Sequence, residues 1–184
     1  MEGGPMMELV AYALVGFVIA TALATAFLRD VLAAIIVFAA YSLGMALLYT
    51  FLLAPDVALT EAVIGVGVTT VLLLLTIAKT VRPTDDRTLE RPDPRALLAC
   101  GALAVVFGLT LPGLPAVGDP DAPIVSYDAV TGYYLAESYE EMGVENTVTA
   151  VLAAYRGFDT FGEATVVFAA GVAVLVVLRR EVLT

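Results

Sequence analysis

The chain has 184 residues, of which 60% are hydrophobic and 15% are charged. Soluble domains contain roughly 45–50% apolar and about 25% charged residues, so this composition indicates a membrane protein that contacts the lipid bilayer. With no histidine, one cysteine and a net charge of −10, the sequence excludes histidine-based zinc or haem sites, catalytic triads, disulfide frameworks and nucleic-acid binding. We therefore expect no metal site, no cofactor and no nucleic-acid partner.

Five apolar runs predict an all-α, polytopic membrane protein with five transmembrane helices. An uncharged run of about 18 or more residues is long enough to cross the hydrocarbon core as a helix. The first run is not expected to be a cleaved signal peptide, because two acids and no basic residue precede it, whereas signal peptides begin with basic residues. Three runs are of this length: 9–28, 31–53 and 57–78, the last with one charge at Glu61. Two are shorter: 96–111 and 164–178.

The basic residues predict the orientation in the membrane. Lysine and arginine favour cytoplasmic loops. Here eight of the nine basic residues occur in the turn after the first helix, in the segment 79–95 and at the C-terminal end; the ninth is Arg156. This alternation places the N-terminus outside and the C-terminus in the cytoplasm, in a multi-pass protein of the cytoplasmic membrane.

We expect two membrane units joined by a linker. A three-helix unit covers 1–81, a basic cytoplasmic linker covers 82–95, and a two-helix unit covers 96–184. The second unit contains an acidic external loop, 112–146, in which four tyrosines lie within 127–142. Tyrosine favours the membrane–water boundary, so this loop is expected to carry a short interfacial helix; a solvated acidic loop is the alternative.

Glu61 is the first candidate for chemistry. It follows Asp56 and lies about 6 Å below the start of a helix that is expected to begin near Val57, at 1.5 Å per residue. A carboxylate at bilayer depth costs roughly 2.5–3.5 kcal/mol on insertion scales, so an intramembrane acid predicts a function. The alternative is an acid that reaches water near the helix end or stabilises the helix N-terminus. Small or hydroxyl-bearing residues follow in the same helix: Gly65, Gly67, Thr69 and Thr70.

A second candidate site consists of Arg156, Asp159 and Glu163. If the chain is helical there, spacings of three and four residues place all three side chains on one face. They form either a structural charge network or part of an ion path. As one helix, 147–178 would span about 48 Å, which exceeds the bilayer, so we expect a break at one of two glycines, Gly157 or Gly162.

Small residues recur every four positions in the first helix. Such a stripe lets another helix approach closely, as the glycines after Glu61 are also expected to do. The residues of the stripe are Gly16, Ala20 and Ala24.

Two strings in the chain resemble a known family. Residues 54–62 (APDVALTEA) and the glycines that follow are similar to the C-terminal part of the large A subunit of Mrp-type multisubunit Na⁺/H⁺ antiporters. They are equally similar to the D subunit of archaeal membrane-bound hydrogenases, the MbhD-like unit. Residues 146–152 and 156–163 (NTVTAVL and RGFDTFGE) resemble the segment that follows in the antiporter protein, the MbhE-like unit. The chain departs from the family at Ala154 and Tyr155, where relatives often carry an acid, which removes one carboxylate from the implied path.

The resemblance implies a transporter subunit without enzymatic activity of its own. Its implied partners are the large antiporter-like subunits and the small membrane subunits of a complex that exchanges Na⁺ and H⁺. Glu61 would relay the ion, while Asp159 and Glu163 would line or support the outer part of the path, with Arg156 and Asp56 as supporting charges. Two alternatives remain open: an ion-translocating subunit of a hydrogenase or complex I-like redox complex, and a scaffold that carries no ion.

Overall fold

A computed structural model describes residues 5–80 and 89–182. Within these ranges the chain is helical throughout its regular structure, apart from one isolated bridge between Leu28 and Leu89. Five of the described helices are long and apolar enough to cross a membrane, as the apolar runs predict. These spans are Met6–Phe27, Val31–Phe51, Pro55–Ala78, Pro94–Gly113 and Gly157–Val176.

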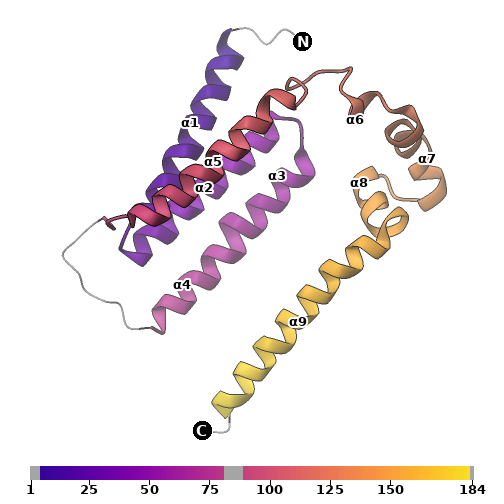
Figure 1. Cartoon of the computed structure of the whole chain (residues 1–184). Helices are drawn as coiled ribbons and strands as arrows, with labels where there is room; N and C mark the ends of the chain where they lie inside the picture. The colour runs from indigo at the N-terminus through magenta and orange to yellow at the C-terminus, as the bar shows by residue number, and fades with distance from the viewer. Residues whose placement is uncertain (1–4, 81–88, 183–184) are drawn as a thin grey trace. The chain divides into compact units, whose positions relative to one another are not determined.

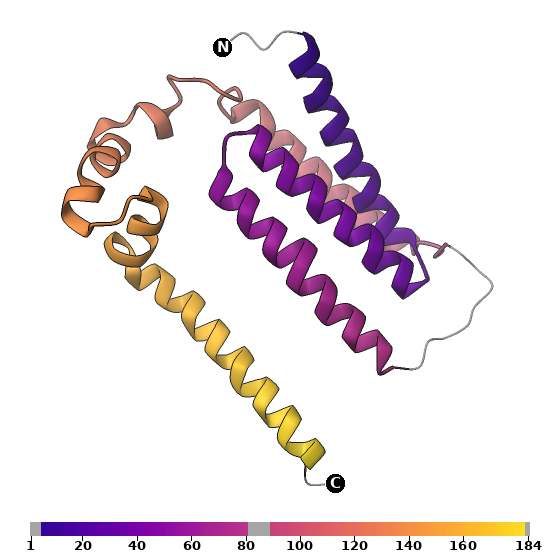
Figure 2. The same cartoon turned by 180° about the vertical axis from the view of Figure 1, so that it is seen from behind.

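The chain divides into two compact units, Met1–Leu109 and Thr110–Thr184. In the first unit, α2 packs against α1 on one side and against the third transmembrane helix on the other, and both views show these three helices side by side (Figures 1 and 2). The third helix is continuous but contains a π-helical segment between two α-helical ones. The elements of this unit are α1 (Pro5–Phe27), α2 (Val31–Phe51), α3 (Pro55–Glu61), η1 (Ala62–Thr69), α4 (Thr70–Ala78) and α5 (Pro94–Thr110).

Polar groups fix the turn between α1 and α2. Asp30 is the N-cap of α2: its Oδ1 accepts hydrogen bonds from the backbone N–H groups of Leu32 (2.8 Å) and Ala33 (3.3 Å). Arg29 pairs with Glu90, with 3.2 Å between Nε and Oε2, and the N–H of Glu90 donates to the carbonyl of Phe27 at 2.8 Å. The start of α2 and the described end of the linker therefore lie together. Arg82 and Arg87 of the expected linker fall outside the described residues.

Glycine sets the distance between α1 and α2. A Cβ on Gly44 would lie 2.8 Å from Cδ1 of Phe17, so a larger residue at this position would push the two helices apart. Gly16 of the predicted small-residue stripe makes no such contact, because nothing in the described chain lies within 4 Å of a Cβ on it. A role for that stripe, together with Ala20 and Ala24, in contacting a neighbouring protein chain stays a prediction.

The second unit begins with short helical segments and ends with one long helix. Gly143 ends α7 with a φ of 65°, and its N–H donates to the carbonyl of Tyr139 at 2.8 Å. Asn146 then caps α8 by accepting a hydrogen bond from the N–H of Thr149 at 2.8 Å. The elements are η2 (Leu111–Gly113), α6 (Pro123–Ser126), η3 (Asp128–Gly132), α7 (Tyr133–Met142), α8 (Thr147–Ala150), η4 (Val151–Tyr155) and α9 (Gly157–Val182).

The predicted break in the last helical region is confirmed at Gly157. Arg156 leaves helical geometry, with φ −121° and ψ 32°, and α9 starts at the next residue. Gly162, the other candidate, lies inside α9. A short helix inside the acidic loop is also confirmed as α7. Its position at the membrane boundary stays a prediction.

Very little of the described chain is buried. The largest side chain with less than 2% exposure is that of Ser42, and the buried hydrophobic residues are one isoleucine and four alanines. All residues of α5 are exposed, and so are all but two of the α9 residues for which burial is described. Because lipid tails are as apolar as leucine, membrane helices do not need an apolar core of their own, and close packing of small residues holds them together.

Candidate ion-path site

Glu61 lies inside the third transmembrane helix. It is the last residue of α3, which begins at Pro55, so its Cα lies about 9 Å along the axis from the helix start at 1.5 Å per residue. The helix begins two residues earlier than the sequence predicts, so Glu61 lies farther from the helix start than expected. Within this chain the residue is half-buried.

A π-helical segment starts directly after Glu61. The segment covers Ala62–Thr69, and its residues include Gly65 and Gly67. π-Helices close i→i+5 hydrogen bonds, are rare, and occur frequently at functional sites. The hydroxyl of Thr70 adds a further link across five residues by donating to the carbonyl of Gly65 at 3.2 Å. The irregular part of the helix backbone therefore begins directly after Glu61.

The carboxylate of Glu61 and the hydroxyl of Ser42 meet at Gly65. A Cβ built on Gly65 would lie 2.5 Å from Oε1 of Glu61, 2.7 Å from Oγ of Ser42 and 2.9 Å from Cβ of Ser42. No side chain fits at such distances, so glycine is required for the two oxygens to occupy this space. Ser42 is 1% exposed, which shows that this part of the α2–η1 interface is closed to solvent. The site thus combines a carboxylate, a hydroxyl and a glycine inside two apolar helices.

The other residues predicted near Glu61 differ in their surroundings: Thr69 and Thr70 are path candidates, Asp56 is a supporting charge, and Gly67 is a packing residue. Thr70 is held by the bond to Gly65, and Thr69, one residue earlier, is half-buried at the end of the π segment. Asp56 lies in the first turn of α3, where a negative charge is stabilised by the helix dipole. Gly67 has only the carbonyl of Ala62, 3.8 Å away, near the position of a Cβ. The roles of these residues in ion movement stay predictions.

The second predicted site is only partly assembled. Nε of Arg156 and Oδ2 of Asp159 form an ion pair at 2.5 Å, with 64% and 58% of the two side chains exposed. Glu163 lies one turn further along α9, is exposed, and forms no ion pair with Arg156 in the described part of the chain. Since α9 begins only after Arg156, this residue does not share the helical face that the spacing predicts. An exposed pair of this kind contributes about 0–1 kcal/mol.

Tyrosines and one glutamate form a cluster in the second unit. Oε1 of Glu141 accepts a hydrogen bond from the hydroxyl of Tyr133 at 2.6 Å, and Oε2 accepts one from the hydroxyl of Tyr155. The rings of Tyr134 and Tyr155 lie 4.9 Å apart between centroids. The cluster therefore connects α7 to η4.

These hydrogen bonds change the proton affinities of the groups involved. The two hydroxyl donors stabilise the charged carboxylate and lower the pKa of Glu141 below its ordinary value. The bond to Glu141 and, less strongly, desolvation raise the pKa of Tyr133 and of Tyr155. Glu141 therefore stays charged, and the hydroxyls of Tyr133 and Tyr155 stay protonated, over a wide pH range.

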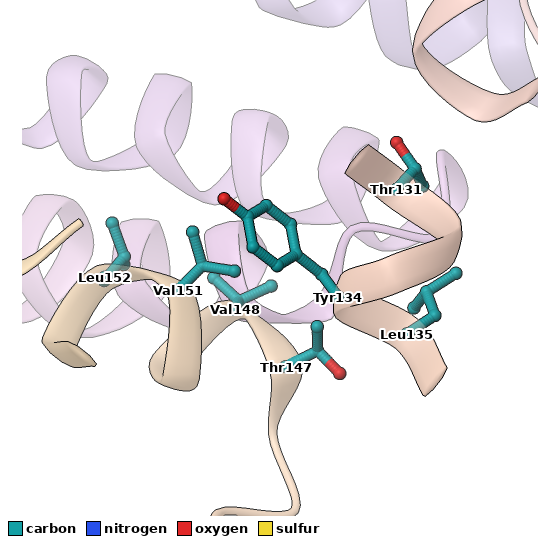
Figure 3. A pocket seen from close by; sticks show the side chains of 7 residues that line it. All are labelled: Thr131, Tyr134, Leu135, Thr147, Val148, Val151 and Leu152. Atoms are coloured by element: carbon teal, nitrogen blue, oxygen red, sulfur yellow. The ribbon is translucent and has the colours of Figure 1, made fainter. Parts of the chain in front are cut away.

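A pocket of about 260 Å³ lies beside this cluster, between α7 and the α8–η4 segment. Figure 3 shows the ring of Tyr134 extending from α7 toward Val148 and Val151. The lining is almost entirely apolar, and none of its residues carries a formal charge. The residues are Thr131, Tyr134, Leu135, Thr147, Val148, Val151 and Leu152.

Comparison with protein families matches both halves of the chain in order. The MbhD model, which describes the D subunit of MBH, matches residues 16–82, and the MbhE model, which describes the E subunit of MBH, matches residues 101–182. The chain consists of an MbhD domain followed by an MbhE domain. Glu61, Gly65 and Ser42 lie in the MbhD domain, and the tyrosine cluster and Arg156 lie in the MbhE domain. The family resemblance of the two sequence strings is thereby confirmed.

Curated relatives extend this similarity over most of the chain. The A subunit of the Na(+)/H(+) antiporter of Bacillus subtilis (strain 168) is 27% identical over 167 residues, which cover 89% of this chain and 20% of the relative. The A1 subunit of the Na(+)/H(+) antiporter of Staphylococcus epidermidis (strain ATCC 12228) is 28% identical over 83% of this chain and 18% of the relative. The A/B subunit of the probable K(+)/H(+) antiporter of Rhizobium meliloti (strain 1021) is 27% identical over 81% of this chain and 15% of the relative. The chain thus spans about a fifth or less of the length of these relatives.

Two parts of these domains were not predicted from the sequence. Ser42 of the MbhD domain was not predicted, although it is the only serine in the apolar helix α2. In the MbhE domain four tyrosines of the acidic loop were grouped, but the structure joins two of these with Tyr155, which lies outside that loop. No spacing rule connects Tyr155 to Glu141, because a turn separates the two segments.

Proposed function

We propose that this chain is a membrane subunit of a monovalent cation/proton antiporter complex that exchanges Na⁺ for H⁺, and that Glu61 relays the ion. The observation that carries the proposal is a half-buried carboxylate beyond the first turn of an apolar transmembrane helix, in an MbhD domain. An ionisable residue at this depth is costly and marks ion or proton pathways. The names of the curated relatives supply the antiporter reaction.

The exposed helices support a role inside a larger assembly. Within the first unit every residue of α5 is exposed, within the second unit nearly all described residues of α9 are exposed, and both helices contain an apolar span. An apolar helix is equally stable against lipid and against apolar partner helices, so such surfaces suit large and small neighbouring subunits. In this proposal Asp159, Glu163, Thr69 and Thr70 contribute to the path, and Arg156 and Asp56 support its charges.

The proposed orientation has the N-terminus outside and the C-terminus in the cytoplasm. The turn carrying Arg29 and the end of the basic linker, at Glu90, are connected by an ion pair of 3.2 Å. This contact supports the prediction that both basic segments lie on the same side of the membrane. By the preference of basic loops, that side is the cytoplasm.

A second candidate function is ion translocation within a membrane-bound hydrogenase. It is favoured by one observation, namely that both matching family models describe subunits of MBH. Purification of the native complex distinguishes the two functions. Co-purifying nickel or iron–sulfur subunits would identify the redox complex, whereas antiporter subunits without them would identify the exchanger.

The test of Glu61 is Glu61→Gln in the assembled complex, with Na⁺-dependent proton exchange measured in membrane vesicles. Glutamine keeps the size and polarity of the side chain but cannot take up or release the proton. Removing a proton-transfer group typically lowers a rate by about 10²-fold or more, so we expect exchange to fall by that amount while the complex still assembles.

Glu140→Gln is the matched control, because Glu140 is an exposed acid of α7. This variant should exchange ions like the wild type. If Glu61→Gln also retains near-wild-type exchange with the complex intact, Glu61 is not the relay, and the scaffold interpretation replaces it.

A further inference from the structure

Ser42 differs from most threonines of the transmembrane helices. Most of these threonines donate to a carbonyl of their own helix, as Thr25 does to Thr21 and Thr50 does to Ala46, at 2.8 and 2.9 Å. This bond satisfies the hydroxyl inside its own helix. The Oγ of Ser42 does not use it: this atom is buried and has no hydrogen-bond partner among the described residues. A buried hydroxyl without a partner is energetically unfavourable.

The unpartnered hydroxyl lies beside the carboxylate of Glu61. Oγ of Ser42 and Oε1 of Glu61 are 2.7 Å and 2.5 Å from one point, the position that a Cβ on Gly65 would occupy. The two oxygens are therefore no farther apart than the sum of these distances, and no side chain at Gly65 separates them. The two groups form no hydrogen bond in the structure, so the contact proposed below requires a change in the Glu61 side-chain conformation.

We propose that Ser42 is a positioning residue for Glu61, holding its carboxyl group at the α2–η1 interface during ion transfer. A hydroxyl is both donor and acceptor. It donates to the carboxylate when Glu61 is charged and accepts from the carboxyl group when Glu61 is protonated, so the same contact serves both states. This inference rests on the proposed function of Glu61 and adds a residue from a different helix to the site.

The alternative is that Ser42 is present only because it is small. Small residues allow close approach of membrane helices, and Ser42 does lie against Gly65. The two possibilities make opposite predictions for Ser42→Ala. Alanine is smaller than serine and removes an unpartnered polar atom, so a packing role predicts unchanged or increased stability with unchanged exchange.

The experiment compares Ser42→Ala and Ser42→Cys in the intact complex, with Ser138→Ala as the control. Ser138 is also buried, at 2% exposed, but its hydroxyl is 3.2 Å from that of Thr147 in the second unit. A hydrogen bond to a charged group corresponds to roughly a tenfold or larger change in an equilibrium or a rate. We therefore expect Ser42→Ala to lower exchange about tenfold or more with the amount of complex unchanged. Ser42→Cys should give an intermediate rate, since a thiol is a weaker hydrogen-bonding group.

Each outcome decides the proposal. Wild-type exchange in Ser42→Ala overturns it, as does a loss of exchange that follows loss of complex, or a cysteine variant no better than alanine. A similar loss of exchange in Ser138→Ala would show a general effect of removing buried hydroxyls and also overturns it. Glu61→Gln, measured in parallel, separates failure of the proposed function from failure of the Ser42 proposal. If Glu61→Gln exchanges normally, the proposed function fails. If only Ser42→Ala exchanges normally, the role of Ser42 fails alone.

Discussion

Replacing Gly65 with alanine tests the geometry of the site directly. The added methyl group would lie 2.5 Å from Oε1 of Glu61, 2.7 Å from Oγ of Ser42 and 2.9 Å from Cβ of Ser42. The Glu61 side chain is flexible and can move away. The Cβ of Ser42 is fixed to the α2 backbone, so relief of that contact requires α2 and the third helix to separate.

The expected magnitude combines two opposing effects. Overpacking of a close-packed site typically costs about 1–3 kcal/mol. Replacing glycine by alanine inside a helix returns roughly 0.5–1 kcal/mol through higher helix propensity. The net expectation for Gly65→Ala is a destabilisation of up to about 2.5 kcal/mol, together with displacement of the Glu61 carboxylate and loss of exchange.

Gly67→Ala is the matched control, because it lies in the same π segment but has its nearest atom, the carbonyl of Ala62, at 3.8 Å. It should be neutral or slightly stabilising and should exchange ions normally. The assay is thermal unfolding of the purified complex in detergent, followed by reconstitution and measurement of Na⁺-dependent proton exchange. Equal behaviour of the two alanine variants would refute the reasoning.

A double variant adds an internal check on Gly65→Ala. Ser42→Gly removes both Ser42 atoms that the new methyl group would contact. Gly65→Ala should therefore cost less stability in the Ser42→Gly background than in the wild type, a coupling that a double-mutant cycle measures. Independent, additive effects of the two changes would contradict the contact between the helices.

Two further predictions concern the ends of the helices. Tyr155→Phe removes one of two hydroxyl donors to Glu141, so the pKa of that carboxyl group should rise toward its ordinary value. A lowered pKa contributes stability at neutral pH that is lost as the pH falls through the folded-state value. The loss of stability in acid should therefore be smaller in the variant and should end at a higher pH. A pH profile of the melting temperature identical to that of the wild type would contradict the cluster. Asp30→Ala should destabilise the complex by about 0.5–2 kcal/mol through loss of the α2 N-cap, whereas Asp30→Asn, which keeps an acceptor, should not. Equal melting temperatures for the two Asp30 variants would show that the cap is not important.

The positions of the transmembrane helices were predictable from the sequence for a simple physical reason. In lipid every backbone polar group needs a partner within the chain, so a long apolar run has to be helical. The ends were predicted within a few residues for the first four helices, where charged residues and prolines interrupt the runs. The last helix was predicted to start at Ala164 but begins seven residues earlier at Gly157, because the polar residues in its first turns belong to the helix.

Glu61 was identified from the sequence alone, because one acid in an apolar run is conspicuous whatever the tertiary structure. Its neighbour across the α2–η1 interface, Ser42, was not. Ser42 is 19 positions earlier, in a helix that is apolar on every side, so hydropathy does not indicate which of its faces meets the third helix. Only the packing of α2 against Gly65 decides that. The same holds for Arg156: its spacing to the acids follows from the sequence, but whether the three share a helical face depends on the residue at which α9 begins.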